Sequence, residues 1–306
     1  MSKVIRIGTR DSELALWQAT TVQNKLEALG HATTLVPVKS DGDLMLDKPL
    51  YELGITGIFT KTLDVALLKG QIDIAVHSMK DVPTALPKGI VQTAVLERAE
   101  ATDVLVHLGT DFLEGEGTVA TGSLRRRAQW LHKYPNHDVV DLRGNVNTRL
   151  IKLIENGWNG GIFAKAGLQR IKLLPKDAIE LDWMIPAPAQ GAMVLVALES
   201  NQEVIFASSA LNDDNTAIAT SVEREFLRKL EGGCTAPIGA IAKISDGHLH
   251  FEGALFSLDG QKKIETKKEV PVSEFQGIGE QCANDVLNNG GVELMEKIKN
   301  EISSVN

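Results

Sequence analysis

Hydrophobic residues in the first third of the chain follow two spacings, one typical of buried strands and one of amphipathic helices. The mostly apolar stretch at 4–7 predicts a strand. After it, apolar residues recur every three or four positions between 15 and 29, which predicts a helix with one buried face. Further strands are predicted at 32–38 and 72–76, with a helix at 59–69 between them. The polar, glycine-containing stretch 40–58 predicts a mobile loop.

The same alternation returns in the middle of the chain. Strands are predicted at 104–106, 119–120, 139–142 and 161–164, and helices at 124–134, 145–156 and 167–173. Both regions contain a strand, a turn rich in hydroxyl groups (9–12 and 121–123) and a helix, which favours two similar lobes. The expected fold class is α/β, with mostly parallel sheets and helices on both faces.

The last third has a different pattern. An apolar strand at 192–198 is expected to return to the first lobe, so that two segments connect the lobes as a hinge. After helices at 201–210 and 214–230, three alternating segments predict an antiparallel sheet, at 237–244, 248–257 and 262–270. Asp246-Gly247 and Asp259-Gly260 fit its turns, and helices at 274–289 and 291–303 complete an α+β domain. The expected domains are 1–96 with 190–208, 98–189, and 212–306.

Composition narrows the class of protein. With 306 residues, 43% hydrophobic and 24% charged, the chain fits a globular protein of two or three domains. No apolar run reaches the roughly 18 residues of a membrane span, and the N-terminus lacks a signal-peptide pattern, so we expect a cytoplasmic protein without membrane contact. The net charge of −8 argues against nucleic-acid binding.

Charge is distributed unevenly. Residues 121–170 hold nine Lys and Arg against three acids, a balance of +6, and the rest of the chain carries −14. Several of these arginines follow predicted strands: Arg125, Arg126, Arg143, Arg149 and Arg170. Arginine forks and helix N-termini at strand ends favour a compact anion such as a carboxylate, although a solvated basic surface is the alternative. Walker and G-x-G-x-x-G phosphate-binding loops are absent from the expected positions.

Asp81 lies in the stretch Q-I-D-I-A-V-H-S-M-K-D-V-P, where a buried strand ends in polar residues. Ligands of open α/β sheets bind outside the carboxyl ends of strands, so Asp81 is a candidate ligand-binding acid. A turn-capping role before Pro83 is equally compatible with the pattern. His77 fits a hydrogen-bonded residue at the strand end better than a general base.

The chain has only two cysteines, which argues against a disulfide framework. Cys234 lies in E-G-G-C-T-A-P-I-G between a helix and a strand, where a cysteine can act as a nucleophile or attachment point; a small packing residue is the alternative. Cys282 fits packing in a helix. His248 and His250 alternate on a strand without a third ligand, so no metal site is predicted.

Several ordered motifs, taken together, resemble the porphobilinogen deaminase (hydroxymethylbilane synthase) family. They are R-I-G-T-R-D-S-E-L-A-L-W-Q-A, V-H-S-M-K-D-V-P, T-G-S-L-R-R, L-R-G-N-V-N-T-R-L, A-K-A-G-L-Q-R, P-A-P-A-Q-G-A and E-G-G-C-T-A-P-I-G. The resemblance covers essentially the whole chain. It implies two lobes like a type II periplasmic binding protein, a third domain, and a monomer.

The resemblance also implies a reaction. A dipyrromethane cofactor, attached through a thioether to Cys234, receives four porphobilinogen molecules in turn, each losing ammonia, and water then releases linear hydroxymethylbilane. Loss of ammonia leaves an electron-poor azafulvene cation, and Asp81 matches the catalytic aspartate that stabilises it and moves protons.

Further site residues follow from the same motifs. Those expected at the cofactor, besides Cys234 and Asp81, are Lys80, Thr121, Ser123, Arg125, Arg126, Asn145 and Ala164. Those expected at the substrate are Arg10, Ser12, Gln18, Phe59, Arg143, Arg149, Arg170 and Gln190. The sequence departs from the family at Glu52 and Thr56, where lysines are usual, and at Asn147, where glycine is usual and asparagine is expected to be tolerated.

Two other functions are compatible with parts of the pattern. A non-enzymatic, two-lobed anion-binding protein would use the same basic cleft but would need neither a covalent adduct nor Cys234. A cysteine hydrolase would need a histidine base near Cys234, and His248 and His250 offer no obvious partner.

Overall fold

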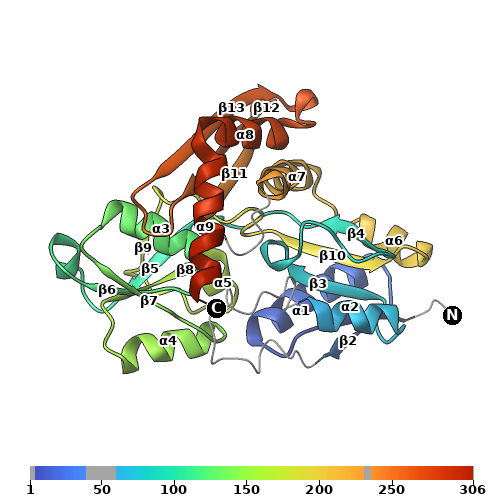
Figure 1. Ribbon diagram of the computed structural model, residues 1–306. Coiled ribbons are helices and arrows are strands. Elements are labelled where there is room, and N and C mark those ends of the chain that lie inside the picture. The colour runs from blue at the N-terminus through green and yellow to red at the C-terminus, as the bar shows by residue number, and fades with distance from the viewer. Residues whose placement is uncertain (1–3, 39–59, 231–235, 306) are drawn as a thin grey trace.

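The computed structural model describes residues 4–38, 60–230 and 236–305, and it places the chain in two α/β lobes and a smaller third domain (Figure 1). The first lobe has a five-stranded sheet in the order β2-β1-β3-β10-β4. Its strands are β1 (Ile5–Thr9), β2 (Thr33–Pro37), β3 (Ile74–Ser78), β4 (Ile90–Val95) and β10 (Met193–Leu198). Helices α1 (Glu13–Ala28) and α6 (Gln202–Ser209) pack on one face and α2 (Lys61–Leu68) on the other.

The second lobe repeats this topology in the order β7-β6-β8-β5-β9. Its strands are β5 (Asp103–His107), β6 (Thr118–Ala120), β7 (Asp138–Val140), β8 (Gly160–Ala164) and β9 (Ile179–Glu180). Helix α3 (Leu124–Lys133) covers one face of this sheet, and α4 (Val146–Glu155) and α5 (Lys165–Arg170) cover the other. The similarity expected between the two lobes is therefore present in the strand order as well as in the turns.

Both large sheets are mixed, which differs from the expected predominance of parallel pairs. Each has two parallel and two antiparallel pairings. The antiparallel strand is in each case the one that enters from the other lobe, β10 in the first and β5 in the second. The apolar strand predicted at 192–198 does return to the first lobe. Strands β4 and β9, which the hydrophobic pattern did not predict, form the far edges of the two sheets.

Two chain segments connect the lobes, and their backbones lie against each other. The amide of Ala99 donates to the carbonyl of Gly191 at 3.2 Å. Gly191 has φ of +88°, and a Cβ atom there would lie 2.5 Å from the Ala99 carbonyl oxygen. This position therefore requires glycine both for its backbone conformation and for the close approach of the two connections.

The third domain consists of an antiparallel sheet covered by helices. Strands β11 (Ile238–Ser245), β12 (His248–Phe256) and β13 (Lys263–Pro271) pack against α7 (Asp214–Lys229), α8 (Ile278–Val286) and α9 (Val292–Val305). The predicted Asp246-Gly247 turn is present, with φ of +50° and +75°, as a two-residue hairpin requires. Cys282 is buried in this core, as expected.

Candidate active site

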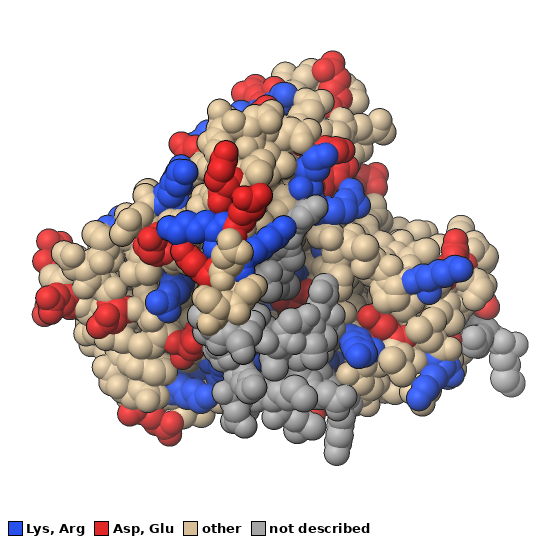
Figure 2. Space-filling model, viewed as in Figure 1, with Lys and Arg blue, Asp and Glu red and all other residues tan. Residues whose placement is uncertain are grey.

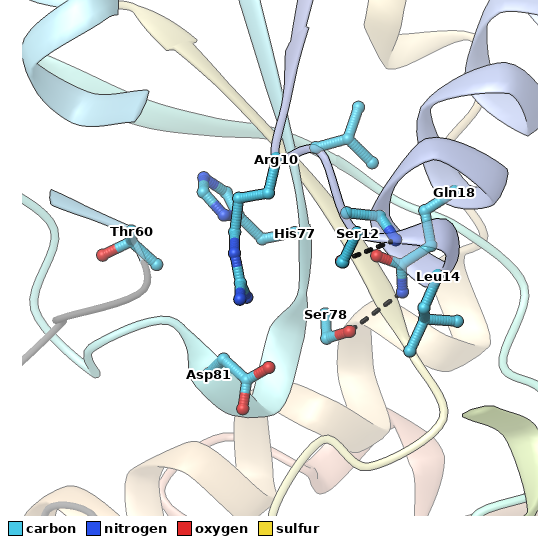
Figure 3. Close-up of a pocket in the computed structure, with 10 residues that line it drawn as sticks. Arg10, Ser12, Leu14, Gln18, Thr60, His77, Ser78 and Asp81 are labelled. Atoms are coloured by element: carbon cyan, nitrogen blue, oxygen red, sulfur yellow. Dashed lines mark hydrogen bonds between the residues drawn. The ribbon is translucent and has the colours of Figure 1, made fainter. Parts of the chain in front are cut away.

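A pocket of about 430 Å³, including its open mouth, lies at the carboxyl end of β3 (Figure 3). Four of the predicted site residues line it: Arg10, Ser12, Gln18 and Asp81. Arg10 and Ser12 come from the turn between β1 and α1, and Asp81 comes from the 3-10 turn η3 (Met79–Asp81) that follows β3. Figure 3 shows the Arg10 guanidinium and the Asp81 carboxylate directed into the same space.

Gln18 links two elements that line this pocket, α1 and the end of β3. Its amide nitrogen donates to the hydroxyl of Ser78 at 2.9 Å, as the dashed line in Figure 3 shows. Ser12 caps α1 by accepting a hydrogen bond from the amide of Ala15. Both residues therefore hold the pocket in shape through local hydrogen bonds.

Lys80, beside Asp81, faces the connection between the lobes. Its ammonium group donates to the Gln190 side-chain carbonyl at 3.2 Å. Burial, together with the Arg126 guanidinium, lowers the pKa of Lys80 to about 8, while Asp81 and Asp103 act in the opposite direction. The cations of the second lobe thus lie within electrostatic range of the Lys80–Asp81 turn.

Asp103, at the start of β5, organises two of the predicted arginines. Arg125 donates to one of its carboxylate oxygens at 2.8 Å, and Arg126 donates to the other at 2.7 Å and 3.1 Å. These two guanidinium groups also donate to the carbonyls of Ile185 and Ile162. Although burial opposes ionisation, the two arginines hold the pKa of Asp103 well below its ordinary range.

Gln190 extends this network between the lobes. Its side-chain nitrogen donates to Asp103 at 2.8 Å and to the Ala101 carbonyl at 2.6 Å, while its oxygen accepts from Lys80. Arg125 and Arg126 are therefore already paired with a protein carboxylate. The hydrogen bonds of the described chain connect them through Asp103 and Gln190 to Lys80.

The remaining predicted arginines approach the same region from other elements. Arg149 donates through Nε to the Gly144 carbonyl, and Arg170 donates to the Gly191 carbonyl and lies 5.5 Å from the centre of the Trp17 ring. Burial, aided by the Arg126 and Arg143 cations, lowers the pKa of Arg149 to about 10, and Asp81 opposes this shift. Burial also lowers the pKa of Arg170 to about 10.

Arg143 has a buried guanidinium nitrogen, Nη1, with no hydrogen-bond partner among residues 4–38, 60–230 and 236–305. Burial lowers the pKa of its guanidinium, and Asp141 acts against that effect. Figure 2 shows acidic and basic side chains interspersed over the visible face, whereas Arg125, Arg126 and Arg143 are only 5%, 6% and 8% exposed. These three arginines are therefore buried and do not belong to a solvated basic surface.

The predicted small and polar residues of the second lobe lie at helix N-termini. Ser123 and Asn145 cap α3 and α4 by accepting hydrogen bonds from backbone amides, and the Thr121 hydroxyl accepts from the Ser123 amide. Ala164 immediately precedes α5. Asn147, where the resembled family has glycine, lies in regular helix and donates to Glu13 of the first lobe at 2.8 Å, so asparagine is accommodated there.

Several expectations fall outside the described residues. They concern Cys234, Phe59, the loop 40–58, and the departures at Glu52 and Thr56. In the part of the chain that is described, no cluster of three metal-ligating side chains occurs, and no helix is both long and apolar enough to span a bilayer.

His77 also lines the pocket, and the sequence interpretation did not assign it a ligand-facing position. It is 6% exposed, and its Nε2 atom has no hydrogen-bond partner within the described chain. Burial, aided by the Arg10 cation, lowers the pKa of His77 to about 4. His77 is therefore a neutral imidazole at neutral pH, and its Nε2 atom is buried beside the pocket.

This neutrality predicts a loss of stability in acid. The unfolded chain takes up a proton at this histidine below about pH 6.5, whereas the folded protein does so only near pH 4. The free energy of unfolding should therefore be fully present above pH 6.5 and should fall by up to about 3 kcal/mol as the pH approaches 4. Between pH 7 and pH 5, the free energy of unfolding measured with urea should fall less for His77→Gln than for the parent. The exposed control His248→Gln should show the same fall as the parent.

Sequence reasoning missed three groups that hold elements of this region in place. They are Asp103; the pair of Arg98 and the buried Glu223, joined at 2.6 Å; and Arg224, which donates to the carbonyls of Val82 and Pro83. Asp103 carried the clearest signal, because an acid heads an otherwise apolar strand, D-V-L-V. Arg98 and Arg224 lie among other charged residues, where nothing in the local pattern distinguishes a buried charge from a solvated one.

Comparisons with known proteins bear on this geometry. Residues 5–206 match a family model described as "Porphobilinogen deaminase, dipyromethane cofactor binding domain", and residues 217–288 match "Porphobilinogen deaminase, C-terminal domain". The chain is similar to porphobilinogen deaminase of Campylobacter hominis, with 40% identity over 96% of this chain and 97% of that protein. It is also similar to the chloroplastic porphobilinogen deaminase of Oryza sativa subsp. japonica, with 43% identity over 88% and 78%.

Among solved structures, a periplasmic binding protein of Salmonella typhimurium shares 13% identity with a TM-score of 0.40, over 71% of this chain and 94% of that one. The family assignment depends on the sequence matches. Two family models that together cover most of the chain, and relatives at 40% identity along nearly its full length, show that this chain belongs to the porphobilinogen deaminase family.

Proposed function

We propose that the chain is a porphobilinogen deaminase (hydroxymethylbilane synthase), a transferase of tetrapyrrole biosynthesis. It joins four porphobilinogen molecules head to tail on a dipyrromethane cofactor, with loss of ammonia at each step, and releases linear hydroxymethylbilane by hydrolysis. The observation that carries this proposal is the grouping of cations around the turn that bears Asp81: the half-buried Lys80 and Arg149 and the buried Arg126.

The residues present fit a ligand with many carboxylates. Porphobilinogen carries an acetate and a propionate, so each added ring brings two negative charges into the protein. Arg143 offers a buried donor without a described partner, and burial lowers the pKa values of Lys80 and Arg149. Burial disfavours the charged forms of these groups, and a carboxylate beside them would stabilise those charged forms. Guanidinium groups can also bind a carboxylate with two parallel hydrogen bonds.

The proposed roles divide by position. Lys80, Arg143, Arg149 and Arg170 hold carboxylates, and Arg10 and Ser12 do so at the mouth of the pocket. Arg125 and Arg126 complete the cofactor site from their fixed positions on Asp103, with Ser123 and the N-terminus of α3 beside them. Gln18, Thr121, Asn145, Ala164 and Gln190 shape the cleft, and Phe59 is assigned to the reacting ring.

Asp81 is the proposed catalytic acid. Its carboxylate lies in the pocket opposite Arg10, where it can accept hydrogen bonds from pyrrole N–H groups and stabilise the cation left when ammonia departs. When bound, dipyrromethane would supply the free α-carbon to which the first porphobilinogen is joined, and each added ring would supply the α-carbon for the next. Asp81 can then accept the proton that this carbon loses.

Cys234 is the proposed attachment point. It lies in the short segment between the end of α7 at Lys229 and the start of β11 at Ile238. The molecule is further proposed to be a cytoplasmic monomer that acts on a small molecule and binds neither nucleic acid nor membrane.

Intact-mass measurement tests the proposal directly. The freshly isolated parent protein should carry an addition of the size of dipyrromethane, and Cys234→Ser should carry none and should release no ammonia from porphobilinogen. Cys282→Ala, a change at the buried cysteine of α8, should keep the addition. A parent protein that consumes porphobilinogen while Cys234 is unmodified would contradict the proposal. A parent protein with neither the addition nor any release of ammonia would favour the reversible anion-binding protein.

A further inference from the structure

The turn that carries Asp81 has little internal support. The 3-10 turn η3 is only three residues long, and the amide of Val82 closes it by donating to the carbonyl of Met79 at 3.2 Å. A turn this short leaves most of its carbonyl groups without partners inside the turn. The surrounding structure must therefore hold it in place.

The first lobe and the interlobe connection hold one side of the turn. The amide of Met79 donates to the carbonyl of Ala192 at 3.0 Å, and Ser78 accepts from Gln18. Lys80 donates to Gln190. These bonds engage residues 78–80. The carbonyls of Val82 and Pro83, and the second lone pair of the Met79 carbonyl, are engaged by another partner.

That partner is Arg224 of α7, in the third domain. One terminal nitrogen of its guanidinium donates to the carbonyls of Met79 at 3.3 Å and Val82 at 2.9 Å. The other terminal nitrogen donates to the carbonyl of Pro83 at 2.6 Å. A planar, permanently charged fork is suited to bridging several carbonyls, which the single ammonium of lysine cannot do with the same geometry.

We infer that Arg224 is a positioning residue for Asp81, an inference that depends on the function proposed above. It brackets Asp81 by binding carbonyls on both sides of it in the sequence, at Met79 and at Val82 and Pro83. It also ties the turn to α7, the helix that leads into the segment of Cys234. The third domain thereby sets the position of an acid that belongs to the first lobe.

Loss of this fork should act on the chemical step more than on binding. Displacement of a catalytic group by about 1 Å can cost on the order of 100-fold in rate. We expect Arg224→Met, of similar length but without donors, to lower kcat by roughly 30- to 100-fold while KM for porphobilinogen changes by less than about threefold. Arg224→Lys should recover part of the loss, and exposed Arg228→Met on the same helix should match the parent.

A double-mutant cycle separates positioning from general stability. If Arg224 acts through Asp81, Arg224→Met should lower single-turnover release of ammonia far less in an Asp81→Asn background than in the parent. Equal losses in both backgrounds, or an unchanged kcat, would overturn the inference. If Arg224→Met does not fold, the same comparison is made with Arg224→Lys. Failure of the parent protein to consume porphobilinogen would instead contradict the proposed function.

Discussion

Asp81→Asn should reduce turnover of porphobilinogen by about 100- to 10,000-fold, the range attributed to a positioned acid or base. Asparagine has nearly the same shape, so the pocket walls formed by Arg10, Ser12 and Gln18 should remain in place. What it removes is the negative charge that faces the substrate cation and the group that accepts the proton. The measurement is single-turnover release of ammonia, made on protein whose intact mass shows that the cofactor is attached.

Asp11→Asn provides the matched control. Asp11 lies in the same turn as Arg10 and Ser12, is exposed, and is not among the residues that line the pocket. Its replacement should leave turnover within about twofold of the parent, as expected for a surface position. Near-normal ammonia release by Asp81→Asn would show that another group handles the proton.

Glu223→Gln should produce the largest loss of stability. Glu223 of α7 is fully buried and accepts hydrogen bonds from Arg98 at 2.6 and 3.1 Å and from the amides of Ala189 and Ala242 at 2.6 and 2.7 Å. Arg98 also donates to the Gln190 carbonyl, so this carboxylate joins both interlobe connections to the third domain. Removal of one partner from a buried ion pair costs about 3–5 kcal/mol, because the remaining charge stays buried without compensation.

Ala189 adds to this expectation, since its φ of +62° is unfavourable for a residue with a Cβ atom and its amide is held by Glu223. Urea unfolding at neutral pH should therefore show a lower midpoint for Glu223→Gln. Glu280→Gln, which breaks the exposed pair with Lys229 at 2.8 Å, should leave the midpoint close to that of the parent, because solvent screens an exposed ion pair. Similar losses for the two variants would mean that the buried carboxylate does not anchor the interlobe connections.

Much of the fold could be predicted because its signals are local. The apolar stripe of α1, the Asp246-Gly247 turn and the return of the strand at 192–198 all occur as predicted. Strand β9 could not be predicted, since it has two residues and gains its pairing only from β5. The antiparallel direction of β10 and β5 could not be predicted either. It arises because each of these strands enters its sheet from the other lobe.

By itself, the sequence determined the α/β class, the basic segment at 121–170, and candidates such as Asp81 and the arginines, since each is a matter of residue type and short-range spacing. Only the tertiary structure decided which charges pair. It joins Arg125 and Arg126 to Asp103, which lies 22 and 23 positions earlier. It also brings Arg224 to the carbonyls beside Asp81 across more than 140 positions. The partner of a buried charge depends on how distant segments pack together. The hydrophobic pattern around that charge therefore does not indicate which residue the partner is.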